Sequence, residues 1–281
     1  MSKMTPLQLG QKLDLPAVSI EALRNFKVSE DTVARLKAAF QQDYALFEEE
    51  VRKEPDADLL VLALYLRWGM DTHYMYAIRG MLWDIFFDTF KDLTLWAKAF
   101  TEETGKPGLK AWEWIRKAIQ MKVFRLGRLE FEPDVLAEDL TVEDTTYPAG
   151  TRVLNIHIPA GEKLTPEAVE DSLGRAQQFF LMYYRQEYEL MRCRSWLLSP
   201  ALEELLDENS NILNFKRRFE LCGTLDHRQA EERVFGKVLE DPAGYPVETS
   251  LQRSLKAHLM AGGKADMGCG VIVCKDAAKL Y

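Results

Sequence analysis

The sequence predicts an α+β fold, in which an all-helical N-terminal domain (residues 1–120) precedes a C-terminal domain (residues 121–281) built on a mixed β-sheet flanked by helices. Up to about Gln120, apolar residues recur at every third or fourth position, which is the spacing of one buried helix face. From Val123 onward, short segments alternate apolar and polar residues as half-buried strands do, and a long helical segment separates two of them. A chain of 281 residues is long enough for two such domains.

The N-terminal half is predicted to be a succession of amphipathic helices. A single long helix after Ser29 accounts for the spacing of its apolar residues Val33, Leu36, Phe40, Tyr44 and Phe47. Further helices are expected at 59–68, 81–100 and 109–119, and Gly105 with Pro107 ends the second of these. Five of the six tryptophans fall in this half, at Trp68, Trp83, Trp96, Trp112 and Trp114, and we expect them to pack in a core rather than to form a ligand cage.

The C-terminal half is predicted to alternate strands with helices. Strands are expected at 123–132, 152–158, 188–198, 212–222 and 271–274. Helices are expected at 166–185, 200–206, 227–235 and 251–260, and the first of these should pack on the sheet. Thr249 and Gln252, three residues apart, form a capping box at the start of the last helix, which explains both residues without a function.

Composition, charge and the motifs that the sequence lacks exclude several classes of partner and cofactor. The net charge of −8 argues against nucleic acid as the main partner, because phosphate neutralisation needs a basic face. The longest apolar run, Leu59 to Leu66, is too short to span a bilayer, so we expect no membrane span. The four cysteines lack close-paired spacing, which favours a reduced cytoplasmic protein without a metal site. The sequence contains neither a P-loop nor a GxGxxG motif.

The best candidate for a functional site is the run LNIHIPAG (154–161), which TPEA (165–168) follows. It predicts an alternating strand, a turn, and a helix with a threonine N-cap and proline at its first position. Such a junction points backbone N–H groups and a positive helix end beyond the strand, where phosphate-bearing cofactors often dock. It also places His157 near the carboxyl end of the strand, on the same face as Asn155.

Three side chains near this junction have reactive groups. His157 can serve as a general base or polarise a carbonyl, and the alternative is a half-exposed strand histidine that holds the following turn. On the strand 188–198, Cys193 and Ser195 share a face and are candidate nucleophiles. No GxSxG elbow surrounds Ser195 and no papain-like surround frames Cys193, for which buried packing is the alternative.

Two arginines are candidate anion contacts. Arg217 is in phase with Phe215 and Phe219 on the predicted strand 212–222, so it should be buried and should need an acidic partner or a bound anion. Arg253 follows the capping box of the last helix, and the cap does not need it.

The segments LNIHIPAG, CRSWLLSP, SNILNF, RVFG and TSLQRSLKAHLMAGG together resemble a bacterial family described as acyltransferase-domain proteins. Its members pair a helical N-terminal domain with a C-terminal domain similar to the GCN5-related N-acetyltransferase (GNAT) fold. The resemblance covers roughly Met121 to Cys274 well and the helical half loosely. It implies transfer of an acyl group from an acyl-CoA-type thioester, such as acetyl-CoA, to an amine of a small-molecule acceptor.

In the GNAT fold a central strand binds the pantetheine arm of the thioester, and the loop after it cradles the pyrophosphate. The candidate catalytic residues are His157 and Ser195. The residues that the resemblance implies for binding the thioester are Ile156, Ile158, Ala160, Gly161, Lys163 and Thr165. The candidate substrate or anion contacts are Asn155, Cys193, Trp196, Arg217 and Arg253.

The predicted pyrophosphate loop departs from the family pattern Q/R-x-x-G-x-G/A. Residues 160–163 supply one glycine only, and Glu162, Glu167 and Glu170 place negative charge where phosphates should lie, opposed by Lys163 alone. The alternative function is therefore a non-catalytic GNAT-like binding or scaffold protein that has lost cofactor binding. A thioesterase, which needs no acceptor, is a third possibility.

Overall fold

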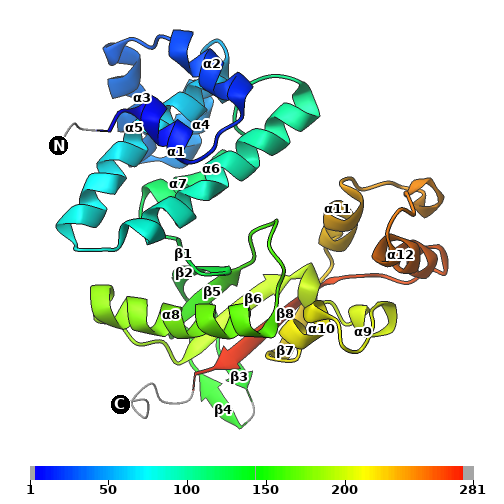
Figure 1. Cartoon of the computed structure of the whole chain (residues 1–281). Helices are drawn as coiled ribbons and strands as arrows, with labels where there is room; N and C mark the ends of the chain where they lie inside the picture. Colours follow the sequence, from blue (N-terminus) through cyan, green and yellow to red (C-terminus); the bar gives the residue numbers. More distant parts are fainter. Residues whose placement is uncertain (1–3, 143, 275–281) are drawn as a thin grey trace. The chain divides into compact units, whose positions relative to one another are not determined.

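The computed structural model describes residues 4–142 and 144–274. The chain divides into two compact units, Met1–Arg125 and Leu126–Tyr281 (Figure 1). The first unit is helical up to the start of β1, and the second holds the main sheet together with the remaining helices, so the predicted α+β fold class is confirmed.

Some helices of the helical unit are shorter than the sequence predicts, and others are longer. They are α1 (Pro6–Lys12), α2 (Ala17–Asn25), α3 (Glu30–Gln42), α4 (Tyr44–Arg52), α5 (Ala57–Ile78), α6 (Trp83–Thr104) and α7 (Trp112–Ile119). The single helix predicted after Ser29 is wrong, because Asp43 is extended and its side chain accepts a hydrogen bond from the Ala45 amide, which starts α4. Gly105 ends α6 in a left-handed conformation, as predicted.

An aromatic cluster forms much of the core of this unit. Phe40, Phe47, Tyr65 and Trp68 lie with ring centroids 4.8–6.2 Å apart. Trp68 and Trp112 are buried and Trp96 and Trp114 half-buried, which confirms the predicted packing for four of the five tryptophans. Trp83 differs, since it is 43% exposed and stacks on His73 with centroids 4.1 Å apart.

Within the described residues, the sheet of the second unit has six strands in the order β1-β2-β5-β6-β8-β7. Their bounds are β1 (Phe124–Leu126), β2 (Leu129–Val135), β5 (Arg152–His157), β6 (Leu190–Ser195), β7 (Glu220–Leu225) and β8 (Met267–Val273). The β5–β6 pair is parallel, whereas the β2–β5, β6–β8 and β7–β8 pairs are antiparallel, so the sheet is mixed as predicted.

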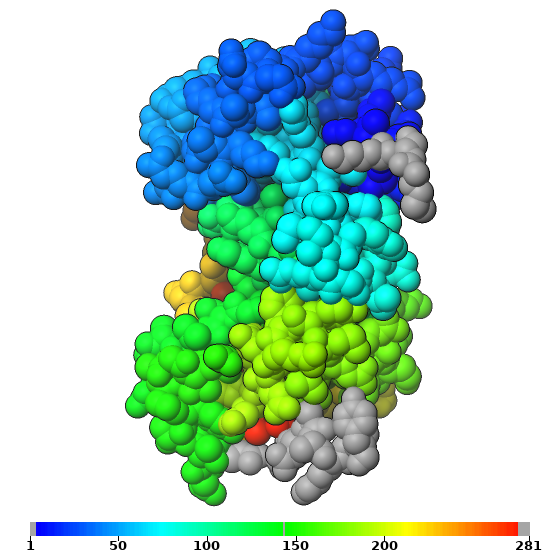
Figure 2. All heavy atoms as spheres, turned by 90° about the vertical axis from the view of Figure 1, so that its left-hand side faces the viewer, coloured from blue at the N-terminus to red at the C-terminus, as the bar shows by residue number. Residues whose placement is uncertain are grey.

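Helix α8 (Pro166–Tyr184) connects the two parallel strands and lies along the sheet in Figure 1. It buries Val169, Ala176 and Phe180, as its predicted periodicity requires. Its other face exposes residues such as Glu167 and Met182, and the yellow-green spheres of this segment lie at the surface in Figure 2.

Smaller elements complete the second unit. The hairpin of β3 (Leu140–Val142) and β4 (Thr145–Tyr147) packs on Val153, Leu190 and Val271 at one end of the sheet. Helices η1 (Trp196–Leu198), α9 (Leu202–Leu205), α10 (Asn211–Lys216), α11 (Gln229–Phe235), η2 (Pro242–Gly244) and α12 (Ser250–Met260) make up the rest. The capping box predicted at Thr249 and Gln252 is present at the start of α12.

The predicted strand 212–222 is wrong over most of its length. Ser210 caps α10 by accepting a hydrogen bond from the Leu213 amide, and Phe215 and Phe219, four residues apart, pack together at the end of this helix. The following strand, β7, starts only at Glu220 and all of its residues are exposed. A spacing of four fits both an even period and one helical turn, and the serine N-cap decides between them.

Three other strand boundaries also shift. The segment 123–132 divides into β1 and β2 at a turn that contains Gly127, which has a φ of +81°. β6 stops at Ser195, where η1 begins, instead of continuing to residue 198. The last strand, β8, starts at Met267, four residues before the predicted start.

Ser172 connects the β1–β2 turn to α8 through hydrogen bonds. Its Oγ accepts hydrogen bonds from the amides of Arg128 at 2.7 Å and Leu129 at 3.2 Å, and donates to the Ala168 carbonyl at 2.9 Å. The residue is fully buried, so water cannot replace these bonds.

We therefore expect Ser172→Ala to lower the free energy of unfolding by about 1–3 kcal/mol, because two buried amides lose their acceptor. Chemical denaturation of the full chain measures this change. Gly174→Ala, in the same helix and with open space for a Cβ, is the matched control and should stabilise by about 0.5–1 kcal/mol. Equal effects of both changes would contradict the assigned role of Ser172.

Candidate functional site

The pairing of the two parallel strands β5 and β6 stops before β6 ends. They pair from Val153 with Leu190 to Ile156 with Cys193. Beyond this point β6 continues along β8 as far as Ser195, opposite Gly268, while β5 ends at His157 and the chain turns toward α8. The site predicted around LNIHIPAG therefore lies where the pairing of two neighbouring strands ends.

The sheet face that carries His157 is polar and acidic. The strand register places Glu130, Glu132 and Asp134 of β2 on the face of Asn155 and His157. Glu132 accepts a hydrogen bond from His157 Nε2 at 3.0 Å. Because an ionised carboxylate can only accept, Nε2 carries the proton in this bond.

Asn155 belongs to a second polar group on this face. Its amide nitrogen donates to Asp134 Oδ2 at 2.9 Å, and its carbonyl oxygen accepts from Arg192 Nε at 2.9 Å. Arg192 also donates to Asp134 Oδ2 at 2.9 Å, and its side chain is only 10% exposed. The three side chains come from β5, β2 and β6, so they hold a rigid polar surface across three strands.

The loop between β5 and α8 is shaped by Arg128. The buried Arg128 donates from Nε to the carbonyls of Glu162 at 3.0 Å and Lys163 at 3.3 Å. In a planar trans peptide the C=O and the next N–H point in opposite directions, so the Lys163 amide faces away from Arg128. Within the described residues, no hydrogen bond involves the amides of Ala160, Gly161 or Lys163, and all three residues are exposed. Gly161 has a φ of +109°, which favours glycine.

The first turns of α8 carry both an N-cap and a nearby cation. Thr165 accepts a hydrogen bond from the Ala168 amide at 3.3 Å, which confirms the predicted cap. Arg218, from the turn between α10 and β7, forms an ion pair with Glu170 and donates to the Pro166 carbonyl at 3.1 Å. The charge of Glu170 is therefore opposed by an arginine that the sequence analysis does not bring to this place.

The structure does not bring Ser195 and Cys193 together with His157. Ile156 pairs with Cys193, so Cys193 and Ser195 share the opposite face of the sheet from His157. Ser195 is buried, and its Oγ accepts from the Leu197 amide at 3.1 Å as the N-cap of η1. Cys193 is fully buried, and burial raises the pKa of its thiol well above the ordinary range, which fits the packing alternative.

The remaining predicted contacts have local structural partners. Arg217 is exposed and donates to the Glu208 carbonyl at 2.8 Å, so its predicted burial on a strand is wrong. Arg253 is exposed as well and donates to the Val247 carbonyl at 3.2 Å. Trp196 is half-buried against the cluster around Ala230 and Phe235.

Sequence reasoning missed Glu132, Asp134, Arg128, Arg192 and Arg218. The alternation Glu130, Glu132, Asp134 in the segment LEFEPDV is a visible signal for an acidic strand face. The three other positions offer no comparable pattern: Arg192 lies on β6, and Arg128 and Arg218 lie in turns.

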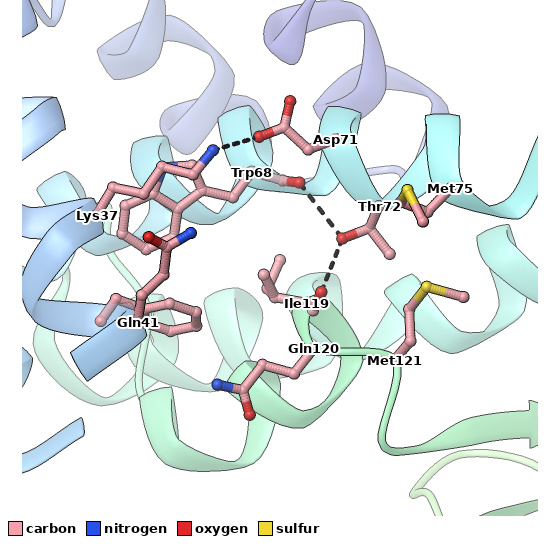
Figure 3. Close-up of a pocket in the computed structure, with 10 residues that line it drawn as sticks. Lys37, Gln41, Trp68, Asp71, Thr72, Met75, Ile119, Gln120 and Met121 are labelled. Carbon is pink, nitrogen blue, oxygen red and sulfur yellow. Dashed lines mark hydrogen bonds and ion pairs between the residues drawn. The ribbon is translucent and has the colours of Figure 1, made fainter. Parts of the chain in front are cut away.

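A separate cavity of about 430 Å³ lies in the helical unit (Figure 3). Phe40, Trp68, Met75, Ile119 and Met121 contribute its apolar lining, and Lys37 and Asp71 form an ion pair at 2.6 Å beside it. Thr72 Oγ1 donates to the Ile119 carbonyl at 2.8 Å across one wall. None of the residues predicted to form the site lines this cavity.

Residues 4–142 and 144–274 contain no group of three or more side chains that could hold a metal ion. No helix in these ranges is long and apolar enough to cross a membrane.

Comparison with protein families matches both halves of the chain. Residues 4–121 match the N-acyltransferase N-terminal domain, and residues 123–272 match the GNAT-like C-terminal domain. No curated protein matches the chain.

Solved acyltransferase structures share the fold of the chain at 23% sequence identity. A complex with decanoyl-CoA has a TM-score of 0.77, and the match covers 95% of this chain and 86% of that chain. A complex with decanoyl-CoA and teicoplanin has a TM-score of 0.75, with 95% and 87% covered. A mutant in complex with octanoyl-CoA has a TM-score of 0.74 and the same coverage.

The Asp134–Arg192 pair generates a prediction about stability. Asp134→Asn should lower the free energy of unfolding by about 1–3 kcal/mol, because the nearly buried guanidinium loses its counter-charge. Denaturation of the full chain measures the change, and Glu138→Gln, at an exposed position after β2, should stay within about 0.5 kcal/mol of the parent. If the loss of unfolding free energy in the double variant Asp134→Asn/Arg192→Met equalled the sum of the two single losses, the two residues would not be coupled.

Proposed function

We infer that this chain, which belongs to the family that joins an N-acyltransferase N-terminal domain to a GNAT-like C-terminal domain, transfers an acyl group from an acyl-CoA thioester to the amine of a small-molecule acceptor. The observation that carries the proposal is that the β5–β6 pairing ends beside the loop that opens α8, while β6 continues to Ser195. It leaves strand-edge groups for an extended thioester arm and N–H groups for its phosphates.

The residues present fit the phosphate end of acyl-CoA. The amides of Ala160, Gly161 and Lys163 and the positive end of α8 supply donors for an anion. Lys163 adds a cation, and Arg218 opposes the charge of Glu170. These contacts support CoA binding although the loop has a single glycine and nearby carboxylates.

The polar sheet face fits a cationic amine acceptor. Glu132 places negative charge beside His157, and a carboxylate attracts an ammonium group, whereas Arg192 balances the charge of Asp134. Such an acceptor must lose a proton before it can attack. A small-molecule acceptor also agrees with the teicoplanin held by one neighbouring structure.

The proposed mechanism is direct attack by the acceptor amine. The thioester supplies an activated carbonyl carbon and a thiolate leaving group. His157 accepts the amine proton on Nδ1, and Glu132 stabilises the resulting imidazolium through Nε2. Ser195 keeps its structural role as the cap of η1, because its hydroxyl faces the other side of the sheet.

Ligand binding tests the first half of this proposal. CoA, octanoyl-CoA and decanoyl-CoA should each raise the melting temperature of the full chain, because a ligand of the native state stabilises it. Gly161→Ala should weaken this effect, since its backbone conformation is unfavourable for alanine although a Cβ has room. Gly150→Ala, also at positive φ with open space, is the matched control and should bind as the parent does. A chain that gains no stability from any of the three ligands would instead be the scaffold alternative.

Kinetics tests the second half. His157→Ala should reduce acyl transfer by about 10²-fold or more, and Glu132→Gln should reduce it less, if His157 is the general base. Acyl-CoA consumption with and without a panel of amines, followed by chromatography, measures both transfer and any amine-independent hydrolysis, which would indicate a thioesterase. His227→Ala, at an exposed histidine after β7, is the control. An unchanged rate for His157→Ala with a lower melting temperature would assign His157 a structural role.

A further inference from the structure

Two cysteines on neighbouring strands lie close enough to react with each other. Cys222 on β7 and Cys269 on β8 have their Sγ atoms 3.2 Å apart. The β7–β8 register shifts between Leu221 and Gly223, so Cys222 is the extra residue of a bulge opposite Cys269. Neighbouring positions on antiparallel strands have the Cα separation that a disulfide accepts. We propose that Cys222 and Cys269 are a modification site, at which oxidation forms a reversible disulfide between β7 and β8.

The geometry selects this pair among the four cysteines. Cys222 is exposed and Cys269 is partly exposed, so an oxidant can reach them. Cys193 is fully buried, and because it pairs with Gly270 it points to the other face of the sheet from Cys269. Cys274 follows the end of β8 and its amide donates to the Glu189 carbonyl on the side of β6, away from β7.

The two strands are also the base of a small lobe. The chain between β7 and β8 contains α11 and α12, which pack around their own core of Ala230, Phe235, Tyr245, Leu255 and Ala265. Figure 1 shows this lobe in orange and brown beyond the ends of β7 and β8. A disulfide between β7 and β8 would link the two strands through which this lobe joins the sheet. Trp196, which follows β6, packs on the same core, so the bond would constrain a residue next to the candidate site.

The chemistry balances with a small disulfide such as oxidised glutathione as the oxidant. The Cys222 thiolate attacks one sulfur of this molecule, and the first glutathione leaves as a thiolate. The Cys269 thiolate then attacks the Cys222 sulfur, breaks the mixed disulfide and releases the second glutathione. The two thiol protons end on the two glutathione molecules, which are reduced while the cysteine pair is oxidised. Partial desolvation of the Cys222 sulfur and the neighbouring Cys269 thiol raise the pKa of Cys222, so the reaction should be faster at mildly alkaline pH.

The experiment incubates the full-length chain with oxidised glutathione at mildly alkaline pH, then alkylates it under denaturing conditions. Of the four thiols, we expect two to be protected, and digestion without reductant should yield one peptide pair joined through Cys222 and Cys269. The oxidised protein should melt several degrees higher than the reduced protein, because the bond closes a long loop in the unfolded chain. A reductant should reverse both changes.

Cysteine variants provide the controls. Cys222→Ser and Cys269→Ser should abolish the protection and the melting shift, whereas Cys274→Ser should keep both. The proposal is overturned if glutathione stays attached to Cys222 without the second exchange, if linked dimers form instead, or if all four thiols of the treated protein still react with the alkylating reagent under denaturing conditions. A melting temperature of Cys222→Ser close to that of the reduced parent shows that the variant is folded. The test does not depend on acyl transfer.

Discussion

The parallel pairing of β5 with β6 is the constraint on which the rest of the C-terminal unit depends. Two adjacent parallel strands need a crossover connection, and α8 supplies it. The start of this helix therefore follows the carboxyl end of β5, where the pairing of the two strands ends. One topological requirement thus brings together an open strand edge, a loop with available amides and a positive helix end.

The two faces of β5 have different functions because side chains alternate along a strand. Leu154 and Ile156 are buried, while Asn155 and His157 face the acidic side chains of β2. The hydrogen bonds from His157 to Glu132 and from Asn155 to Asp134 are diagonal to the strand register. They cross-link β2 and β5 beyond their backbone pairing, so the polar face is held rigid without a contribution from the core. Such pre-organisation is what a general base requires.

Buried arginines organise the surroundings of the site more than its acids do. Arg128 donates hydrogen bonds to two carbonyls of the loop after β5, and the backbone amide of Arg128 donates in turn to Ser172 on α8. Arg192 holds Asn155 and Asp134 in place from β6. Arg128 donates to two carbonyls of one loop, and Arg192 donates to acceptors on two different strands. A lysine, with a single point charge, makes such paired contacts less specifically.

The sequence by itself determined the fold class, the β5–loop–α8 junction and the two helix caps at Thr165 and Thr249, because these depend on residues within one turn or strand of each other. It failed at Arg217, where an even spacing of Phe215 and Phe219 fits a strand as well as one helical turn. Only the tertiary structure decided that Glu132 reaches His157, that Arg218 opposes Glu170, and that Cys222 meets Cys269. These partners are 25 to 48 residues apart, and strand register and bulges, which local patterns do not encode, set which of them meet.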